Sequence, residues 1–280
     1  ICSGLVGSEM CIRDRFYLRH STYKNYLKHD SSLKQKISNV FNQYGIKVAL
    51  DDNQVVWAHS DLLNVDENFA ESISTLQDLN DYGFDVEYVG LQSVLDKPLI
   101  VNGREYDYPM SKRYLDVSKY FEKIRPIFPN IKIGIIDSSP AHVSAESYEN
   151  TYAGLVDHLL QKGYRLDFIH LDLPMSYPRK GKNGLSFPKV VNIQKYVNHS
   201  LGLPFGFLII DEEGGKAGSD QFSKYTIEGL AEYLENGGKA ESFIMSSWYE
   251  NPAYSIPDSI TQSPATGTVS YTHLTLPTTR

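Results

Sequence analysis

The feature that most constrains the fold is a regular alternation of short apolar runs with longer amphipathic stretches. Runs rich in Ile, Val and Phe are spaced by 40, 45, 35, 39 and 37 residues, and they begin at Ile46, Val86, Ile131, Leu166, Phe205 and Ser242. The segments between them place apolar residues three and four positions apart, which is typical of helices that bury one face. This alternation predicts parallel strands joined by helical crossovers.

Glycines stand at the ends of the predicted helices, shortly before the predicted strands. They are Gly45, Gly83, Gly163, Gly202 and Gly237. A glycine just after the last turn accepts the left-handed backbone conformation that ends many helices. The five glycines therefore mark predicted helix ends and support the same segmentation of the chain.

Two architectures accommodate such units: a closed (β/α)8 barrel and an open, doubly wound sheet. No G-x-G-x-x-G follows the first predicted strand, which disfavours the dinucleotide-binding form of the open sheet. Polar residues follow every predicted strand, and a barrel gathers all strand ends around one mouth. We therefore predict an α/β fold of the (β/α)8 TIM-barrel type, truncated at its N-terminus, with about six βα units visible.

The two ends of the chain set the predicted domain boundaries. One permitted set of codons for Met10 to Asp14 has a reverse complement that encodes Val269 to His273, and both ends resemble translated sequencing-library adapters. We interpret 1–15 and 269–280 as non-native segments of a metagenomic fragment, 16–258 as a partial barrel domain, and 259–268 as a linker or closing segment.

Composition disfavours several classes of partner. Residues 16–268 carry 24 basic and 32 acidic side chains, and this negative balance disfavours nucleic acid as a partner. No run of 18 apolar residues predicts a membrane span. The histidines lack H-x-H and H-E-x-x-H spacings, so neither a metal site nor another cofactor is predicted.

Alternation along the predicted strands directs a set of polar and aromatic side chains to the barrel mouth. This set is Asp51, Gln92, His170, Asp172, Glu212 and Trp248. Crowded carboxyl groups beside an aromatic surface are typical of acid/base chemistry on a sugar, where one carboxyl is protonated and another ionised. Asp172 and Glu212 are the catalytic candidates. The predicted substrate contacts are Asp51, Gln92, His170, Trp248 and Tyr249; His170 can equally be a buried histidine with a structural partner.

The chain resembles the catalytic barrels of retaining glycoside hydrolases. Those barrels have a Glu at the end of the penultimate strand, as at Glu212 here, and a Trp on the last strand, as in "SSWYENP" with Trp248. The resemblance implies that Glu212 is the nucleophile and that Trp248 forms the floor of the sugar site. It also implies an oligo- or polysaccharide substrate and a secreted or periplasmic location. The chain departs from that family at the fourth strand, where those enzymes carry an Asn-Glu pair and this chain has Gln92.

Two other functions remain open at this point. The glycine-rich segment Gly214–Ser219 could form a loop that binds phosphate together with Lys216, which would indicate a barrel aldolase or isomerase acting on a sugar phosphate. The missing Asn-Glu pair is also consistent with a barrel that binds carbohydrate without catalysis.

Overall fold

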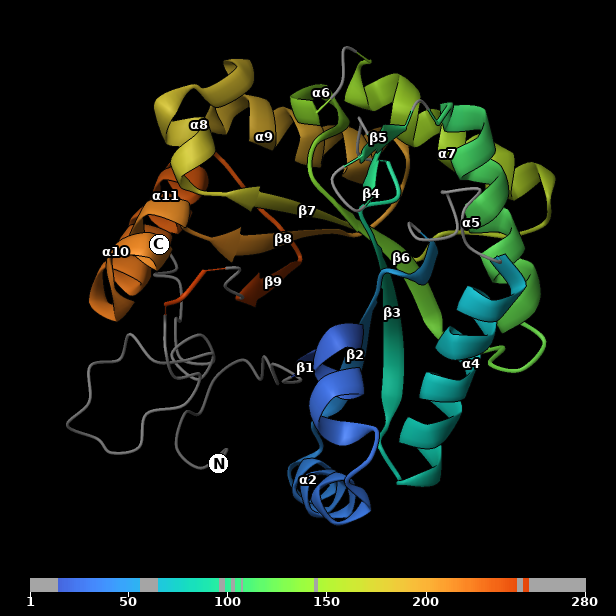
Figure 1. Cartoon of the computed structure of the whole chain (residues 1–280). Helices are drawn as coiled ribbons and strands as arrows, with labels where there is room; N and C mark the ends of the chain where they lie inside the picture. The colour runs from blue at the N-terminus through green and yellow to red at the C-terminus, as the bar shows by residue number, and fades with distance from the viewer. Residues whose placement is uncertain are drawn as a thin grey trace, which may run out of the picture.

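The computed structural model describes residues 15–55, 65–95, 99–101, 104–106, 108–143, 146–245 and 249–251 (Figure 1). The strands are β1 (Arg15–Arg19), β2 (Lys47–Asp52), β3 (Val86–Gln92), β4 (Leu99–Val101), β5 (Arg104–Tyr106), β6 (Lys132–Asp137), β7 (Ile169–Pro174), β8 (Phe205–Ile210) and β9 (Ser242–Met245). The longer helices are α2 (Ser31–Tyr44), α4 (Val65–Asp81), α5 (Met110–Ile124), α7 (Tyr148–Gln161), α9 (Phe187–Lys195) and α11 (Ser219–Glu235). The shorter helical segments are α1 (His20–Thr22), η1 (Tyr23–Leu27), α6 (Pro140–Val143), α8 (Ser176–Lys180), η2 (Lys182–Gly184), η3 (Tyr196–Ser200) and α10 (Glu212–Ala217).

Seven of the described strands form one parallel sheet in the order β1-β2-β3-β6-β7-β8-β9. Successive strands are neighbours throughout, without the reversal of order that defines a doubly wound sheet. Side chains from the two ends of this order, Tyr17 of β1 and Ile244 of β9, pack in the same interior clusters, so the sheet curves into a nearly closed barrel. The predicted TIM-type fold is therefore confirmed. The antiparallel pair β4-β5 follows β3 as an insertion.

The parallel sheet has one strand more than the sequence indicated. The structure has seven parallel strands where six were predicted, and the additional strand is β1. It begins at Arg15, the last residue assigned to the non-native N-terminal segment, and it pairs in parallel with β2. In the sequence "RFYLR", Leu18 is buried while Arg15 and Phe16 are exposed, so the strand lacks the long apolar run that identified the others.

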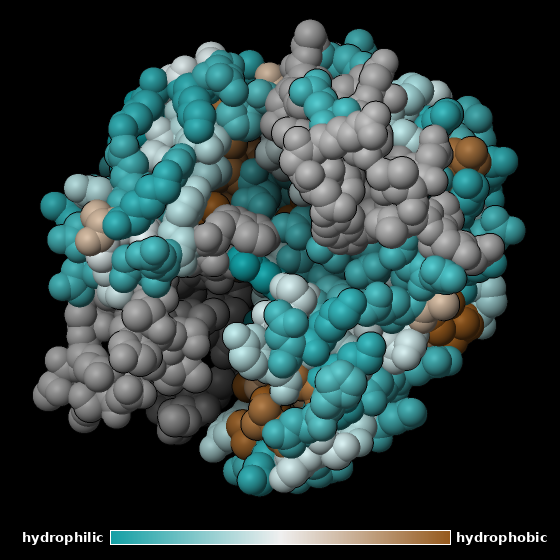
Figure 2. All heavy atoms as spheres, viewed as in Figure 1, coloured by the Kyte–Doolittle hydropathy of each residue, from teal (hydrophilic) through white to brown (hydrophobic). Residues whose placement is uncertain are grey.

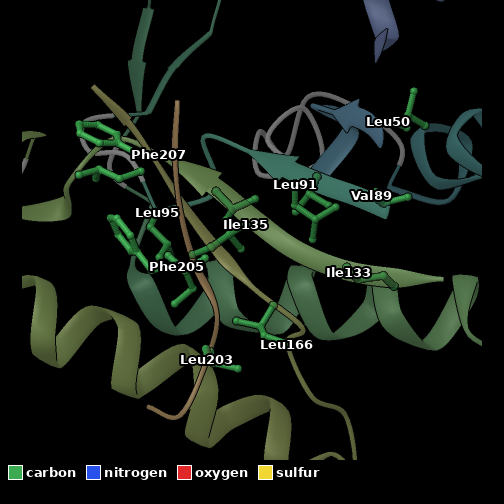
Figure 3. Packing of buried hydrophobic residues seen from close by; sticks show 14 of the residues in the cluster. Leu50, Val89, Leu91, Leu95, Ile133, Ile135, Leu166, Leu203, Phe205 and Phe207 are labelled. Atoms are coloured by element: carbon green, nitrogen blue, oxygen red, sulfur yellow. The ribbon is translucent and has the colours of Figure 1, made fainter. Parts of the chain in front are cut away.

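The main core lies between the outer face of the sheet and the helices. Figure 3 shows part of this layer, in which outward-facing strand residues pack together; it includes Leu50, Val89, Leu91, Ile133, Ile135, Phe205 and Phe207. Each of these residues has an exposed fraction of 0%. Removal of their apolar surface from water is the dominant favourable term in the stability of such a layer.

The five glycines predicted at helix ends have positive φ angles, between 63° and 87°. At the end of α2, Gly45 has a φ of 65°, and the amide of Ile46 donates to the carbonyl oxygen of Phe41 at 2.8 Å. This reversal satisfies a carbonyl of the last helical turn and directs the chain into β2. The predicted helix ends are confirmed.

The outer surfaces of the helices are largely hydrophilic, and a hydrophobic patch lies beside α2 (Figure 2). An apolar groove of about 220 Å³ lies here between β1 and α2, and its lining includes Phe16, Leu33 and Phe41. No helix in the described ranges has the length and apolar character needed to cross a membrane. The predicted segments 259–268 and 269–280 lie outside the described residues, as do residues 1–14 of the predicted N-terminal segment.

Candidate active site at the barrel mouth

The strand register confirms which side chains point into the barrel. Tyr88, Ile136 and Phe168 form a buried interior cluster, packed with Tyr17, Ala49 and Ile244. Their neighbours in the sequence, such as Val89 and Ile135, belong to the outer core. At the carboxyl ends of the strands the inward positions become polar, and the mouth of the barrel is formed there.

Asp51 lies on the inward face of β2, one residue before the strand ends. Its register partners are Arg19 on β1 and Gly90 on β3, and its exposed fraction is 3%. Burial raises the pKa of Asp51 to about 7, although the nearby Tyr17 hydroxyl and Arg19 guanidinium act to lower it. At neutral pH this carboxyl therefore holds its proton in a large fraction of the molecules.

Asp172 lies on the inward face of β7, and it is half-buried. Burial raises the pKa of the Tyr17 hydroxyl well above its usual range, and the carboxylates of Asp51 and Asp172 raise it further. Burial likewise raises the pKa of the Tyr249 hydroxyl, and the negative charges of Glu212 and Asp172 are among those that raise it further. Asp172 is therefore within electrostatic reach of two tyrosines, one beside Asp51 and the other beside Glu212.

Glu212 differs from its predicted position. Strand alternation predicted an inward position for it at the end of the strand, but β8 ends at Ile210 and Glu212 is the first residue of α10. Its Oε1 accepts a hydrogen bond from Lys216 Nζ at 2.5 Å, and Lys182 Nζ lies 3.9 Å from Oε2. The hydrogen bond from Lys216 is the main cause that lowers the pKa of Glu212, so this carboxyl is ionised at neutral pH.

The glycine-rich segment also differs from the predicted phosphate-binding loop. Residues 212–217 form the helix α10, whose first turn contains two glutamates. A Cβ on Gly214 would come within 2.5 Å of the Gln221 carbonyl oxygen, and one on Gly215 would come within 2.7 Å of the Tyr249 ring. Close packing explains both glycines, while the acidic first turn and the Lys216–Glu212 ion pair oppose phosphate binding.

Two tyrosines lie beside Glu212. The ring of Tyr177 on α8 has Lys182 Nζ at 3.5 Å from its centroid, and its hydroxyl also acts to lower the pKa of Glu212. The ring of Tyr249 has Lys216 Nζ at 5.5 Å and packs against Gly215. Tyrosine faces of this kind can stack on the apolar faces of sugar rings. Trp248, the predicted floor of the sugar site, lies outside the described residues.

His170 lies on the inward face as predicted, one layer deeper in the barrel than Asp172. Its Nε2 is 3.1 Å from the Ser242 hydroxyl, and its ring centroid is 4.5 Å from that of Phe168. Burial lowers the pKa of His170 to about 3, and the Arg15 charge lowers it further, so the ring is neutral. Gln92 is the last residue of β3 and is half-exposed at the mouth.

Three further carboxylates at strand ends stabilise the fold. Asp52 accepts hydrogen bonds from the Tyr120 hydroxyl at 2.8 Å and from the Gln54 amide at 2.9 Å. Asp137 accepts from the Leu95 amide at 2.5 Å. Asp211 accepts from the Gly214 amide at 2.6 Å and caps α10.

Three residues of the site were not predicted from the sequence: Tyr17, Arg19 and Tyr177. Tyr17 and Arg19 belong to β1, where they alternate with the buried Leu18, and this period-two pattern was the available signal. Tyr177 lies on the short helix after β7, where no strand periodicity applies. No group of three or more His, Cys, Asp or Glu residues in the described part of the chain is arranged to hold a metal ion.

No protein-family model matches the chain, and no curated protein sequence matches it. Among solved structures, the chain is similar to xylanase 10C from Cellvibrio japonicus, with 11% identity, a TM-score of 0.52, and coverage of 85% of this chain and 57% of that one. It is similar to a variant of xylanase A from P. fluorescens subsp. cellulosa in complex with xylopentaose, with 15% identity, a TM-score of 0.51, and coverage of 77% and 71%. For xylanase 10B from Thermotoga maritima the identity is 14%, the TM-score 0.50, and the coverage 78% and 70%. The chain thus spans little more than half the length of the first of these proteins, and at such low identity the similarity concerns the fold.

Proposed function

We propose that this protein hydrolyses glycosidic bonds at the barrel mouth, with Asp172 and Glu212 as catalytic carboxyl groups. The observation that carries the proposal is the position of both carboxylates within electrostatic reach of one tyrosine, Tyr249. Asp172 lies on β7, and Glu212 follows the neighbouring strand β8 by two residues, which supports a common site at this edge of the barrel. Most glycoside hydrolases use two carboxyl groups, one on either side of the bond that is cleaved.

Glu212 has the properties of the ionised member of the pair. Lys216 and Lys182 stabilise its negative charge, and its side chain is 24% exposed, so a substrate at the mouth can reach it. An ionised carboxylate can attack the anomeric carbon directly or activate a water molecule for that attack. Of the predicted substrate contacts, Tyr249 supports the proposal best, because its ring lies beside Glu212 and can stack on a sugar. The roles of Asp51, Gln92, His170 and Trp248 as substrate contacts stay predictions.

The comparisons indicate which substrates to assay first. The three solved structures are named as xylanases, and one holds xylopentaose. Xylopentaose is therefore the first probe for this chain, followed by cellopentaose and a panel of 4-nitrophenyl glycosides. Sugars released at neutral pH would be measured by chromatography, and binding by isothermal titration calorimetry.

The variants Glu212→Gln and Asp172→Asn test the catalytic roles. Each should lower turnover at least about 100-fold, since each removes a group that acts in the transition state, while sugar binding changes little. Glu213→Gln is the matched control, because Glu213 is the adjacent carboxylate, is 45% exposed and pairs with Lys180. Full activity in both catalytic variants would refute the assignment. Binding of xylopentaose without turnover would instead indicate the non-catalytic carbohydrate-binding barrel.

A further inference from the structure

The proposed reaction needs a proton donor as well as an ionised carboxylate. The leaving sugar departs as an alkoxide unless its oxygen receives a proton while the bond breaks. Glu212 does not meet this need, because Lys216 and Lys182 hold it in the ionised form. A donor must be a carboxyl group that points into the barrel and keeps its proton near neutral pH.

The buried carboxyl groups at the described strand ends differ in the direction that they face. Asp52, Asp137 and Asp211 accept hydrogen bonds from groups outside the barrel, from Tyr120, Leu95 and Gly214 respectively. Asp51 lies on the inward face of β2, beside Arg19, and is 97% buried. In the described part of the chain no hydrogen-bond partner reaches its Oδ1 atom. Such an oxygen is costly to bury, and Asp211 has one as well, so the inward direction of Asp51 is the feature that distinguishes it.

We propose that Asp51 is the general acid of the barrel mouth and that it donates its proton to the glycosidic oxygen of the substrate. This inference rests on the proposed function: Glu212 remains the ionised carboxylate and Asp51 takes the role of the acid. Asp172 remains the third carboxyl group of the site, where it acts on Tyr17 and Tyr249. Asp51 would therefore be a catalytic residue, whereas its predicted role was that of a substrate contact.

The groups around Asp51 support this role. From β1, the Tyr17 hydroxyl and the Arg19 guanidinium face its carboxyl, and both favour its ionised form. On its own strand, Asp52 favours the protonated form, while β3 contributes the uncharged Gly90 as register partner. Asp172 of β7 acts on the same Tyr17 hydroxyl from across the barrel. Burial outweighs the two stabilising partners and leaves the pKa of Asp51 at about 7, which suits proton transfer at neutral pH.

The chemical step requires no reactant other than the glycoside and water. As the bond from the anomeric carbon to the glycosidic oxygen breaks, the Asp51 proton moves to that oxygen, and the leaving sugar departs as an alcohol. Asp51 is then a carboxylate. If water displaces Glu212 from a glycosyl ester, its oxygen bonds to the anomeric carbon and its proton returns to Asp51. If water attacks the anomeric carbon directly, Glu212 accepts the proton, and Glu212 and Asp51 then return to their starting protonation states by exchange with solvent.

The test compares substrates that need an acid with substrates that do not. Four proteins would be assayed: wild type, Asp51→Asn, Tyr17→Phe and Asp85→Asn. The substrates are xylopentaose and 2,4-dinitrophenyl β-xyloside, or the corresponding oligosaccharide and dinitrophenyl glycoside of whichever sugar the wild type cleaves. Asp85→Asn is the control, because Asp85 pairs with Lys47 at the opposite end of β2. A thermal melt followed by circular dichroism confirms that each variant is folded.

Asp51→Asn should lose at least about 100-fold in kcat/KM on the oligosaccharide and less than about 10-fold on the dinitrophenyl glycoside, whose leaving group needs no proton. The decline of kcat/KM above pH 7 should disappear in this variant. Tyr17→Phe removes a group that lowers the pKa of Asp51, so kcat/KM of this variant should begin to decline at a higher pH. This variant keeps the carboxyl group and therefore provides a second test. Equal losses on both substrates, or an unchanged decline above pH 7, would refute the role of Asp51 alone. A wild type that cleaves no glycoside would refute the proposed function and this role together.

Discussion

The imidazole of His170 lies directly against the backbone of Gly206 on the neighbouring strand. The two residues are register partners in β7 and β8, and a Cβ on Gly206 would stand 2.1 Å from a ring carbon of His170. The same Cβ would be 2.5 Å from the Ser242 hydroxyl, which is hydrogen-bonded to the ring. A glycine at this position therefore makes room for a buried, neutral histidine in the barrel interior.

We expect Gly206→Ala to lower the free energy of unfolding by about 1 to 3 kcal/mol, because the added methyl group overpacks a rigid interior. Urea denaturation would measure this change. The control is the double variant Gly206→Ala/His170→Ala, in which removal of the ring makes space for the methyl group. If the two substitutions destabilise additively, the contact between the ring and Gly206 is not the cause.

Much of the barrel could be predicted because its signals are local in the sequence. Burial of one strand face gives the apolar residues a period of two, and burial of one helix face gives them a period near 3.6. Both periods can be recognised in the sequence without tertiary information. The inward positions of Asp51, Gln92 and Asp172 followed from that alternation. The strand β1 was missed because two of its five residues are arginines and only Leu18 is fully buried.

The position of Glu212 could not be predicted from periodicity, because a strand becomes a helix within one residue there. Asp211 ends the extended backbone and caps α10, and the glycines at 214 and 215 are poor helix formers that favoured a loop. Tertiary packing overrides this preference, since the two glycines lie against α11 and against Tyr249, where larger side chains would collide. Contacts between segments distant in sequence leave no local pattern.

His170 should make the protein sensitive to acid. Its folded pKa of about 3 lies below the ordinary value of 6.5, so the unfolded chain binds a proton that the folded protein does not as pH falls from 6.5 toward 3. Stability is complete above 6.5 and decreases below it, by roughly 2 to 3 kcal/mol at pH 4.5. Chemical denaturation of wild type and His170→Gln at pH 7.5 and 4.5 would measure this, because the variant lacks the titrating ring. A stability difference between the two proteins that is the same at both pH values would contradict the prediction.

Lys216 should control the acidic side of the activity profile if Glu212 acts in its ionised form. The Lys216 hydrogen bond lowers the pKa of Glu212, so Lys216→Met should raise that pKa toward its usual range. The decline of kcat/KM at low pH would then begin at higher pH, with little change near pH 7. Lys224→Met is the control, since Lys224 forms an equivalent pair with Glu228, at 3.9 Å, on the outer helix α11. An acidic limb that does not move in Lys216→Met would argue against Glu212 as the ionised catalytic group.

Asp51 should reduce the stability of the protein as pH rises from about 4 to about 7, independently of any activity. Burial disfavours the ionised form of Asp51, so the pKa of this carboxyl is 3.8 in the unfolded chain and about 7 in the folded protein. As pH rises from 3.8 to 7 the unfolded chain releases a proton that the folded protein retains, and stability falls by at most about 4 kcal/mol. Asp51→Asn carries no titrating group and should therefore gain stability relative to wild type as pH is raised from 4 to 8, as measured by urea denaturation at both values. Tyr17→Phe should behave in the opposite way, because the hydroxyl that partly stabilises the ionised carboxyl is absent. A gain in Asp51→Asn that is equal at pH 4 and pH 8 would show that Asp51 is already ionised in the folded protein, and the proton for the proposed reaction would then have to come from another group.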